Sequence, residues 1–191
     1  EGGETGRITL NLDPQGPLVS EMSIAATGQT AQAQPILRGI DPVAFLTVGE
    51  RKLPPRRPPG MSVFNAFFDN PASRPFQRYR SEFTLGDVAV TSHGRRATVV
   101  LNGLTIGSFR GAWQIHLYPG SRLIHVEAAV TTQEANRAIV YDAGLASASP
   151  PPGKLAWVDT EGAPQRIEIA PAADRSLAVR SRSIILEADH G

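Results

Sequence analysis

Five residues that can donate, accept or transfer protons are concentrated on either side of a short turn, between residues 114 and 127. An imidazole and a carboxylate can act as general acid and base. Side-chain amides, imidazoles and carboxylates also satisfy the hydroxyls of a sugar, while an aromatic ring covers its apolar face. We therefore predict a carbohydrate site on this stretch. Its catalytic candidates are His125, Glu127 and His116, and its substrate-binding candidates are Gln114 and Tyr118.

Arg110 is a further candidate for substrate binding, because it stands between Phe109 and Gly111 where the same stretch begins. A guanidinium group can hold a carboxylate, such as that of a uronic acid, with two parallel hydrogen bonds. A surface ion pair is the alternative use of this side chain.

A long β-hairpin is predicted around turn residues 118–121, which read Tyr-Pro-Gly-Ser. Proline presets φ at the second position of a type II turn, and glycine accepts the positive φ at the third. If the two ends of this turn pair, His116 faces Leu123 and Gln114 faces His125. Side chains alternate between the faces of a strand, so the polar candidates share one face. The opposite, apolar face carries Trp113, Ile115, Leu117, Ile124 and Val126.

Two other interpretations of the polar face remain open. His116, His125 and Glu127 form a ligand set suited to zinc or non-haem iron. In the predicted register, however, the two histidines are diagonal across the strand pair, and no H-E-x-x-H or H-x-H spacing is present. We therefore predict no metal and no cofactor. The face can equally be exposed to solvent or covered by another domain, because apolar-in and polar-out alternation is usual in a sandwich.

The composition argues against several classes of function. The chain has 191 residues and a formal net charge of +1, so no overall field favours a nucleic-acid partner. It has no cysteine, which rules out a thiol nucleophile and Cys-ligated zinc. No apolar run approaches the ~20 residues of a membrane-spanning helix, so we predict no membrane span. The motifs of serine hydrolases, P-loop enzymes and dinucleotide-binding enzymes do not occur.

Short runs with strand-like alternation recur along the chain, and turn residues separate them. They predict an all-β fold with very little helix, arranged as one large antiparallel β-sandwich over residues 1–191. Asn102-Gly103 is the strongest two-residue hairpin signal. The proline-rich segment 51–60 is predicted to be an exposed connection. A short helix is predicted from the spacing of Phe64, Phe67 and Phe68.

The middle third of the chain, from Phe76 to Leu145, resembles the supersandwich domains of carbohydrate-active enzymes. The resemblance rests on the hairpin GSFRGAWQIHLYPGSRLIHVEAAV and the following strand IVYDAGL. Such domains have the galactose-mutarotase-like fold and occur in glycoside hydrolases and polysaccharide lyases. For mutarotases the resemblance implies a catalytic histidine and glutamate on the concave sheet, where this chain offers His116 or His125 with Glu127. In accessory domains that face often packs on a catalytic domain.

We therefore expect a carbohydrate-associated domain of a bacterial glycoside hydrolase or polysaccharide lyase, which binds saccharide or scaffolds a catalytic domain. The alternatives are a stand-alone sugar-active enzyme with His/Glu acid–base chemistry, and a structural or adhesion sandwich without a small-molecule site. The chain begins at Glu1 without methionine and ends in a strand-like run, so we expect a fragment or processed piece. Its expected partner is a saccharide or another domain or chain of the same protein, in the periplasm or outside the cell.

Overall fold

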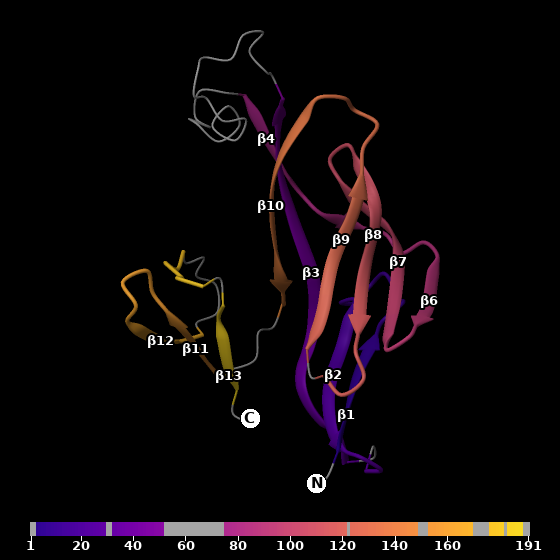
Figure 1. Ribbon diagram of the computed structural model, residues 1–191, viewed down its shortest axis with the longest axis vertical. Helices are drawn as coiled ribbons and strands as arrows, with labels where there is room; N and C mark the ends of the chain where they lie inside the picture. Colours follow the sequence, from indigo (N-terminus) through magenta and orange to yellow (C-terminus); the bar gives the residue numbers. More distant parts are fainter. Residues whose placement is uncertain are drawn as a thin grey trace. The chain divides into compact units, whose positions relative to one another are not determined.

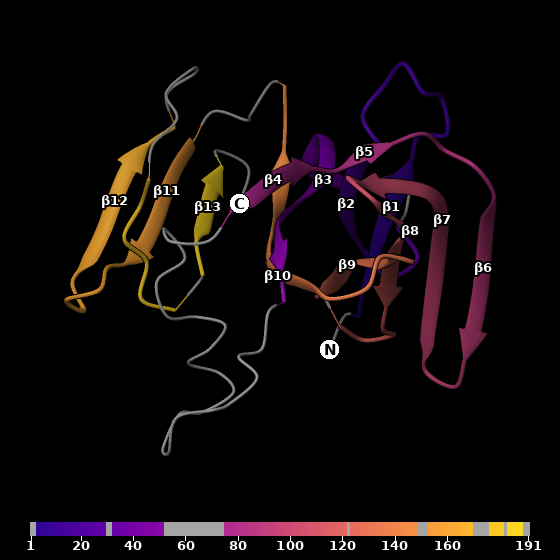
Figure 2. The same ribbon diagram turned by 90° about the horizontal axis from the view of Figure 1, so that it is seen from above.

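The computed structural model is built almost entirely from antiparallel β-strands (Figure 1; Figure 2). The predicted all-β sandwich class is thereby confirmed. The chain divides into two compact units, residues 1–41 with 146–191 and residues 42–145. The structure describes residues 3–29, 32–51, 75–121, 123–148, 153–169, 176–181 and 183–188.

The first unit contains a sheet built from β1 (Glu4–Leu10), β2 (Val19–Ala26) and the beginning of β3 (Gln34–Glu50). Neighbouring strands are antiparallel. The link between β1 and β2 carries turn residues and is closed by a hydrogen bond of 2.8 Å from Asn11 N to Leu18 O. The alternating patterns in this part of the sequence therefore form strands as predicted.

A second sheet of the first unit has three strands. β11 (Gly153–Val158) lies between β12 (Pro164–Glu168) and β13 (Ile185–Ala188), and both pairings are antiparallel. The hairpin between β11 and β12 turns at Asp159, whose carboxylate accepts hydrogen bonds from the backbone N–H groups of Glu161 and Ala163. The bond from Ala163, followed by one from the side-chain amide of Gln165, holds the pKa of Asp159 below its ordinary value.

The second unit contains two antiparallel sheets. In one, the later part of β3 neighbours both β4 (Phe76–Arg80) and β10 (Arg137–Ala146). In the other, the strand order is β5-β7-β8-β9, and β6 also pairs with β7. The predicted meander is confirmed from β6 to β9, where each strand pairs with the next. The strands of this sheet are β5 (Glu82–Phe83), β6 (Val88–His93), β7 (Arg96–Ile106), β8 (Phe109–Leu117) and β9 (Ile124–Thr131).

The core of the second unit is centred on β3, β7 and β8. Leu46 on β3 and Trp113 on β8 are almost inaccessible to solvent. Trp113 and Ile115 belong to the predicted apolar face of the hairpin, which therefore does form part of the core. β8 also buries His116, which lies on the opposite, polar face. A buried imidazole needs hydrogen-bond partners at its ring nitrogens, and neighbouring residues of the site provide them.

The predicted hairpin turn at Asn102-Gly103 is wrong, because β7 runs continuously through both residues. The pairing with β8 shifts between Asn102 and Leu104, and Gly103 has a φ of 111°. Gly103 is therefore the extra residue of a β-bulge. A bulge and a tight turn can both require a glycine at positive φ, so this dipeptide is compatible with either. The chain reverses instead at Gly107-Ser108.

The predicted register of the β8–β9 hairpin is wrong by two residues. His116 faces His125 and not Leu123, and Gln114 faces Glu127 and not His125. Because side chains alternate with a period of two, a two-residue shift leaves each of them on its predicted face. The shift therefore changes which polar residues are neighbours without moving any of them into the core.

The predicted turn itself does form, and it explains the shift. Ser121 N donates to Tyr118 O over 3.0 Å, and Gly120 has a φ of 76°, as a type II turn requires. A type II turn does not match the right-handed twist of a tight two-residue hairpin. The ladder accordingly ends at Leu117 and Ile124, and the turn lies inside a longer connection.

Two predicted elements lie outside the described residues. They are the proline-rich connection 51–60, apart from Arg51, and the short helix at Phe64, Phe67 and Phe68. Over the part of the chain that the structure describes, no helix is long and apolar enough to cross a membrane.

The Gly103→Ala substitution is expected to destabilise the protein. A Cβ at this position would overlap the backbone carbonyl of Thr84, and the positive φ is unfavourable for alanine. We expect the free energy of unfolding to fall by about 2–4 kcal/mol in denaturant titrations. Gly94→Ala is the matched control, because Gly94 has a φ of 60° but open space around it. Equal losses for the two variants would contradict the bulge contact.

Candidate functional site

The polar face of β7, β8 and β9 brings the sequence-predicted residues together. Thr98, His116 and His125 are direct partners in one row across the three strands. In the adjacent row, Gln114 faces Glu127. Directly opposite residues of an antiparallel pair point to the same face. The side chains of His116, His125 and Glu127 therefore converge, and we refer to these three residues as the His–Glu cluster.

His116 is the fixed centre of the His–Glu cluster. It is only 5% exposed, and both of its ring nitrogens have partners. Nδ1 lies 2.9 Å from Thr98 Oγ1, and Nε2 lies 3.1 Å from Glu127 Oε1. A carboxylate can only accept, so Nε2 carries the proton that His116 donates to Glu127. In the neutral imidazole Nδ1 then accepts from the Thr98 hydroxyl, and the buried ring is fully satisfied.

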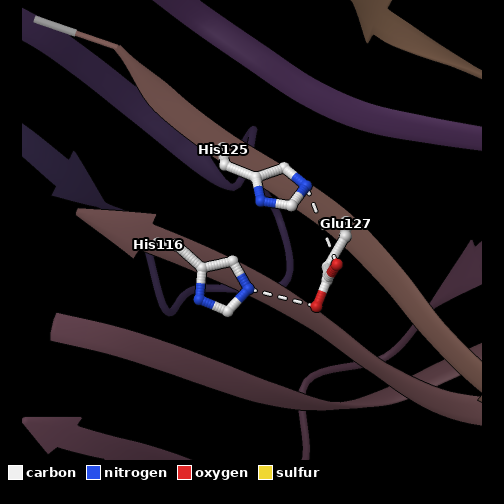
Figure 3. Close-up of side chains that lie close together, drawn as sticks. All are labelled: His116, His125 and Glu127. Carbon is white, nitrogen blue, oxygen red and sulfur yellow. Dashed lines mark hydrogen bonds and ion pairs between the residues drawn. The ribbon is translucent and has the colours of Figure 1, made fainter. Parts of the chain in front are cut away.

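Glu127 interacts with both imidazoles through its carboxylate (Figure 3). Its second carboxylate oxygen, Oε2, lies 3.7 Å from His125 Nε2. The side chains of His125 and Glu127 are 56% and 42% exposed, whereas that of His116 is 7% exposed. The two imidazole rings are tilted by 36°, with centroids 5.1 Å apart. One imidazole is thus buried with a partner at each ring nitrogen, while the other is more than half exposed.

The order hydroxyl, imidazole, carboxylate in Thr98, His116 and Glu127 is also that of a hydrolase triad. A nucleophile must, however, reach a substrate carbonyl. Thr98 is only 7% exposed, and its hydroxyl is enclosed with a buried ring. Thr98 and His116 are therefore best described as positioning residues, and the exposed chemistry of the cluster belongs to His125 and Glu127.

Tyr141 on β10 adds a fourth titratable group near the cluster. Burial raises the pKa of its phenol above the ordinary value, and the negative charge of Glu127 raises it further. The backbone of Ala128 has the opposite effect. Tyr141 therefore lies close enough to Glu127 for the charge of the carboxylate to act on the phenol.

His125 also lines a mainly apolar cleft of about 360 Å³. The cleft is open to solvent and is formed by parts of β3, β8, β9 and β10. Trp113, Ile124 and Val126 belong to the apolar face of the hairpin, so the cleft lies mainly on the side of the sheet opposite to Glu127. The other residues that line the cleft are Pro42, Val43, Trp113, Ile124, Val126, Ala143, Gly144 and Leu145.

The remaining predicted residues differ in how close they come to the cluster. Gln114 is half-buried and directly opposite Glu127, so it belongs to the same patch. Tyr118 is exposed in the connection beyond the end of β8. Arg110 lies six positions from His116 along β8, about 20 Å away. Its Nη1 donates to the backbone carbonyls of Gly107 and Phe109, so the structure does not bring it to the cluster.

The sequence did not indicate that Thr98 and Tyr141 lie near the His–Glu cluster. Thr98 is the partner of His116 only because the bulge at Gly103 shifts the pairing by one residue, since without it Val99 would face His116. With Asn102-Gly103 interpreted as a turn, Thr98 and His116 were not on paired segments. Tyr141 was predicted to lie in a strand, but no sequence signal indicated that this strand approaches Glu127.

A scan of the sequence against protein-family models finds no match, and a search of the curated proteins finds no similar sequence. The resemblance to galactose-mutarotase-like domains therefore stays a prediction. The interpretation of the site depends on its own residues and geometry.

Replacing Thr98 by valine tests the buried network. The substitution preserves shape but leaves Nδ1 of His116 without a partner, which we expect to cost about 1–3 kcal/mol of unfolding free energy. Thr91→Val is the matched control, because Thr91 is the exposed β6 partner of Thr98 and should change stability by less than about 0.5 kcal/mol. A Thr98→Val protein as stable as the control would contradict the hydrogen bond to His116.

Proposed function

We propose that this chain is a carbohydrate-associated β-sandwich domain that binds a saccharide at the exposed side of the His–Glu cluster. The observation that supports this function best is the exposed pair of His125 and Glu127, whose Nε2 and Oε2 atoms lie 3.7 Å apart, with Gln114 directly opposite Glu127. Sugar hydroxyls are bound by imidazole, carboxylate and amide groups of this kind. A bacterial exported glycoside hydrolase or polysaccharide lyase remains the proposed context.

Each exposed residue has a defined role in this proposal. Glu127 accepts hydrogen bonds from sugar hydroxyls, while His116 holds the carboxylate in place from the buried side. His125 donates or accepts at a neighbouring hydroxyl, and the Gln114 amide, opposite Glu127, adds a donor and an acceptor. Because His116 already orients the Glu127 carboxylate in the free protein, this side chain loses little conformational freedom when a ligand binds.

Acid–base catalysis on the bound sugar is a second candidate function. Its support is the distance of 3.7 Å between His125 Nε2 and Glu127 Oε2, with both groups accessible. An imidazole and a carboxylate that both face solvent can serve as acid and base towards a bound sugar in an elimination or an epimerisation. This function retains the same binding residues and adds turnover of the ligand.

A glycan array that includes uronic acid oligosaccharides, followed by calorimetric titration of the glycans retained, tests the proposal. We expect specific retention by the wild-type protein. Glu127→Gln and His125→Ala should each weaken binding by about tenfold or more, because each removes a hydrogen bond to a charged or strongly polar group. Incubation of retained glycans with the protein then shows whether products appear.

Glu82→Gln and His93→Ala are the matched controls. Glu82 is exposed on β5 of the same sheet, and His93 is exposed at the end of β6. Both variants should bind as the wild type does. The proposal is contradicted if no glycan is retained, or if the control and cluster variants weaken binding equally.

A further inference from the structure

We propose that His116, His125 and Glu127 form a binding site for a zinc-type divalent transition-metal ion. The sequence argued against a metal because the two histidines were predicted to lie diagonally across the hairpin. In the structure they are directly opposite, and one ligand atom from each of the three residues lies within 4.8 Å of the others. The site goes beyond the proposed saccharide binding and does not depend on it.

Two of the three ligand atoms already have the spacing of a metal site. His116 Nε2 and Glu127 Oε1 are 3.1 Å apart. Ligand atoms on a tetrahedral zinc ion with bonds of 2.0–2.1 Å are separated by about 3.3 Å. An ion can therefore replace the proton between the imidazole and the carboxylate with little movement of either. His125 is exposed, so its ring can rotate to complete the set.

Thr98 supplies the partner that a metal-bound His116 needs. When Nε2 binds an ion it must give up its proton, and a neutral ring then carries that proton on Nδ1. The hydroxyl of Thr98, 2.9 Å from Nδ1, can change from donor to acceptor, so the buried ring stays satisfied in either tautomer. A metal-binding histidine usually donates its second N–H to such a partner, which fixes the ring.

The ligand chemistry selects the class of ion. Two imidazoles and one carboxylate suit zinc and other late first-row divalent ions, whereas Ca²⁺ and Mg²⁺ prefer sites made of oxygen atoms. Three protein ligands leave a fourth position for water or for an oxygen of a bound molecule. Because His125 and Glu127 are the exposed members, this position opens towards solvent.

Titration of the protein with Zn²⁺ in the absence of saccharide tests this site. We expect one ion per chain by calorimetry, a rise in melting temperature, and visible absorption typical of tetrahedral coordination when Co²⁺ replaces Zn²⁺. His125→Ala and Glu127→Gln should lower Zn²⁺ affinity at least about tenfold. Thr98→Val should lower it about 10–100-fold, and Thr98→Ser, which keeps the hydroxyl, should retain it.

His93→Ala controls for adventitious binding, because His93 is an exposed histidine at the end of β6 and should not affect the ion. The proposal is overturned if the wild-type protein binds no stoichiometric Zn²⁺, or if His125→Ala and Glu127→Gln bind it as tightly as the wild type. Since no saccharide is present, failure of this titration is distinct from failure of the glycan array. If the protein binds zinc but retains no glycan, the metal site is supported and the proposed saccharide binding is contradicted.

Discussion

The cluster depends on one constraint, which is that a buried imidazole must have partners at both ring nitrogens. An unsatisfied buried polar group costs about 1–3 kcal/mol, a large part of the stability of a domain. His116 meets this constraint with Thr98 on one neighbouring strand and Glu127 on the other. These two hydrogen bonds fix the His116 ring and orient the Glu127 carboxylate. The bonds that satisfy the buried ring therefore also position the carboxylate that lies beside His125 on the exposed side.

Backbone pairing decides whether those partners are present. The bulge at Gly103 advances β7 by one residue and brings Thr98, not Val99, opposite His116. The connection between β8 and β9 sets the second pairing and places His125 beside His116 and Glu127 one row away. Neither feature lies within the cluster. Its chemistry is therefore determined by a bulge within β7 and by the connection that follows β8, and each contains a glycine at positive φ, Gly103 and Gly120.

The sequence predicted correctly which side chains share a face of the β8–β9 hairpin. It did not predict which residues are cross-strand partners. Alternation around the 118–121 turn correctly separated Trp113 and Ile115 from the polar side chains, because the period of a strand is local. The β8–β9 register was missed by two residues because a turn signal does not determine where the ladder resumes. Gly103 was misassigned because a bulge and a turn can both call for a glycine at positive φ. The roles of Thr98 and Tyr141 depend on pairing and packing that no local pattern contains.

His116 is held between Thr98 and Glu127 with its proton on Nε2. Nitrogen-15 NMR of the histidine side chains in metal-free protein measures this directly, because the two neutral tautomers have distinct ring-nitrogen shifts. We predict a single Nε2–H tautomer for His116, with a ring proton that exchanges slowly because it is buried and hydrogen bonded. A mixture of tautomers, or a rapidly exchanging ring proton like that of exposed His93, would contradict it.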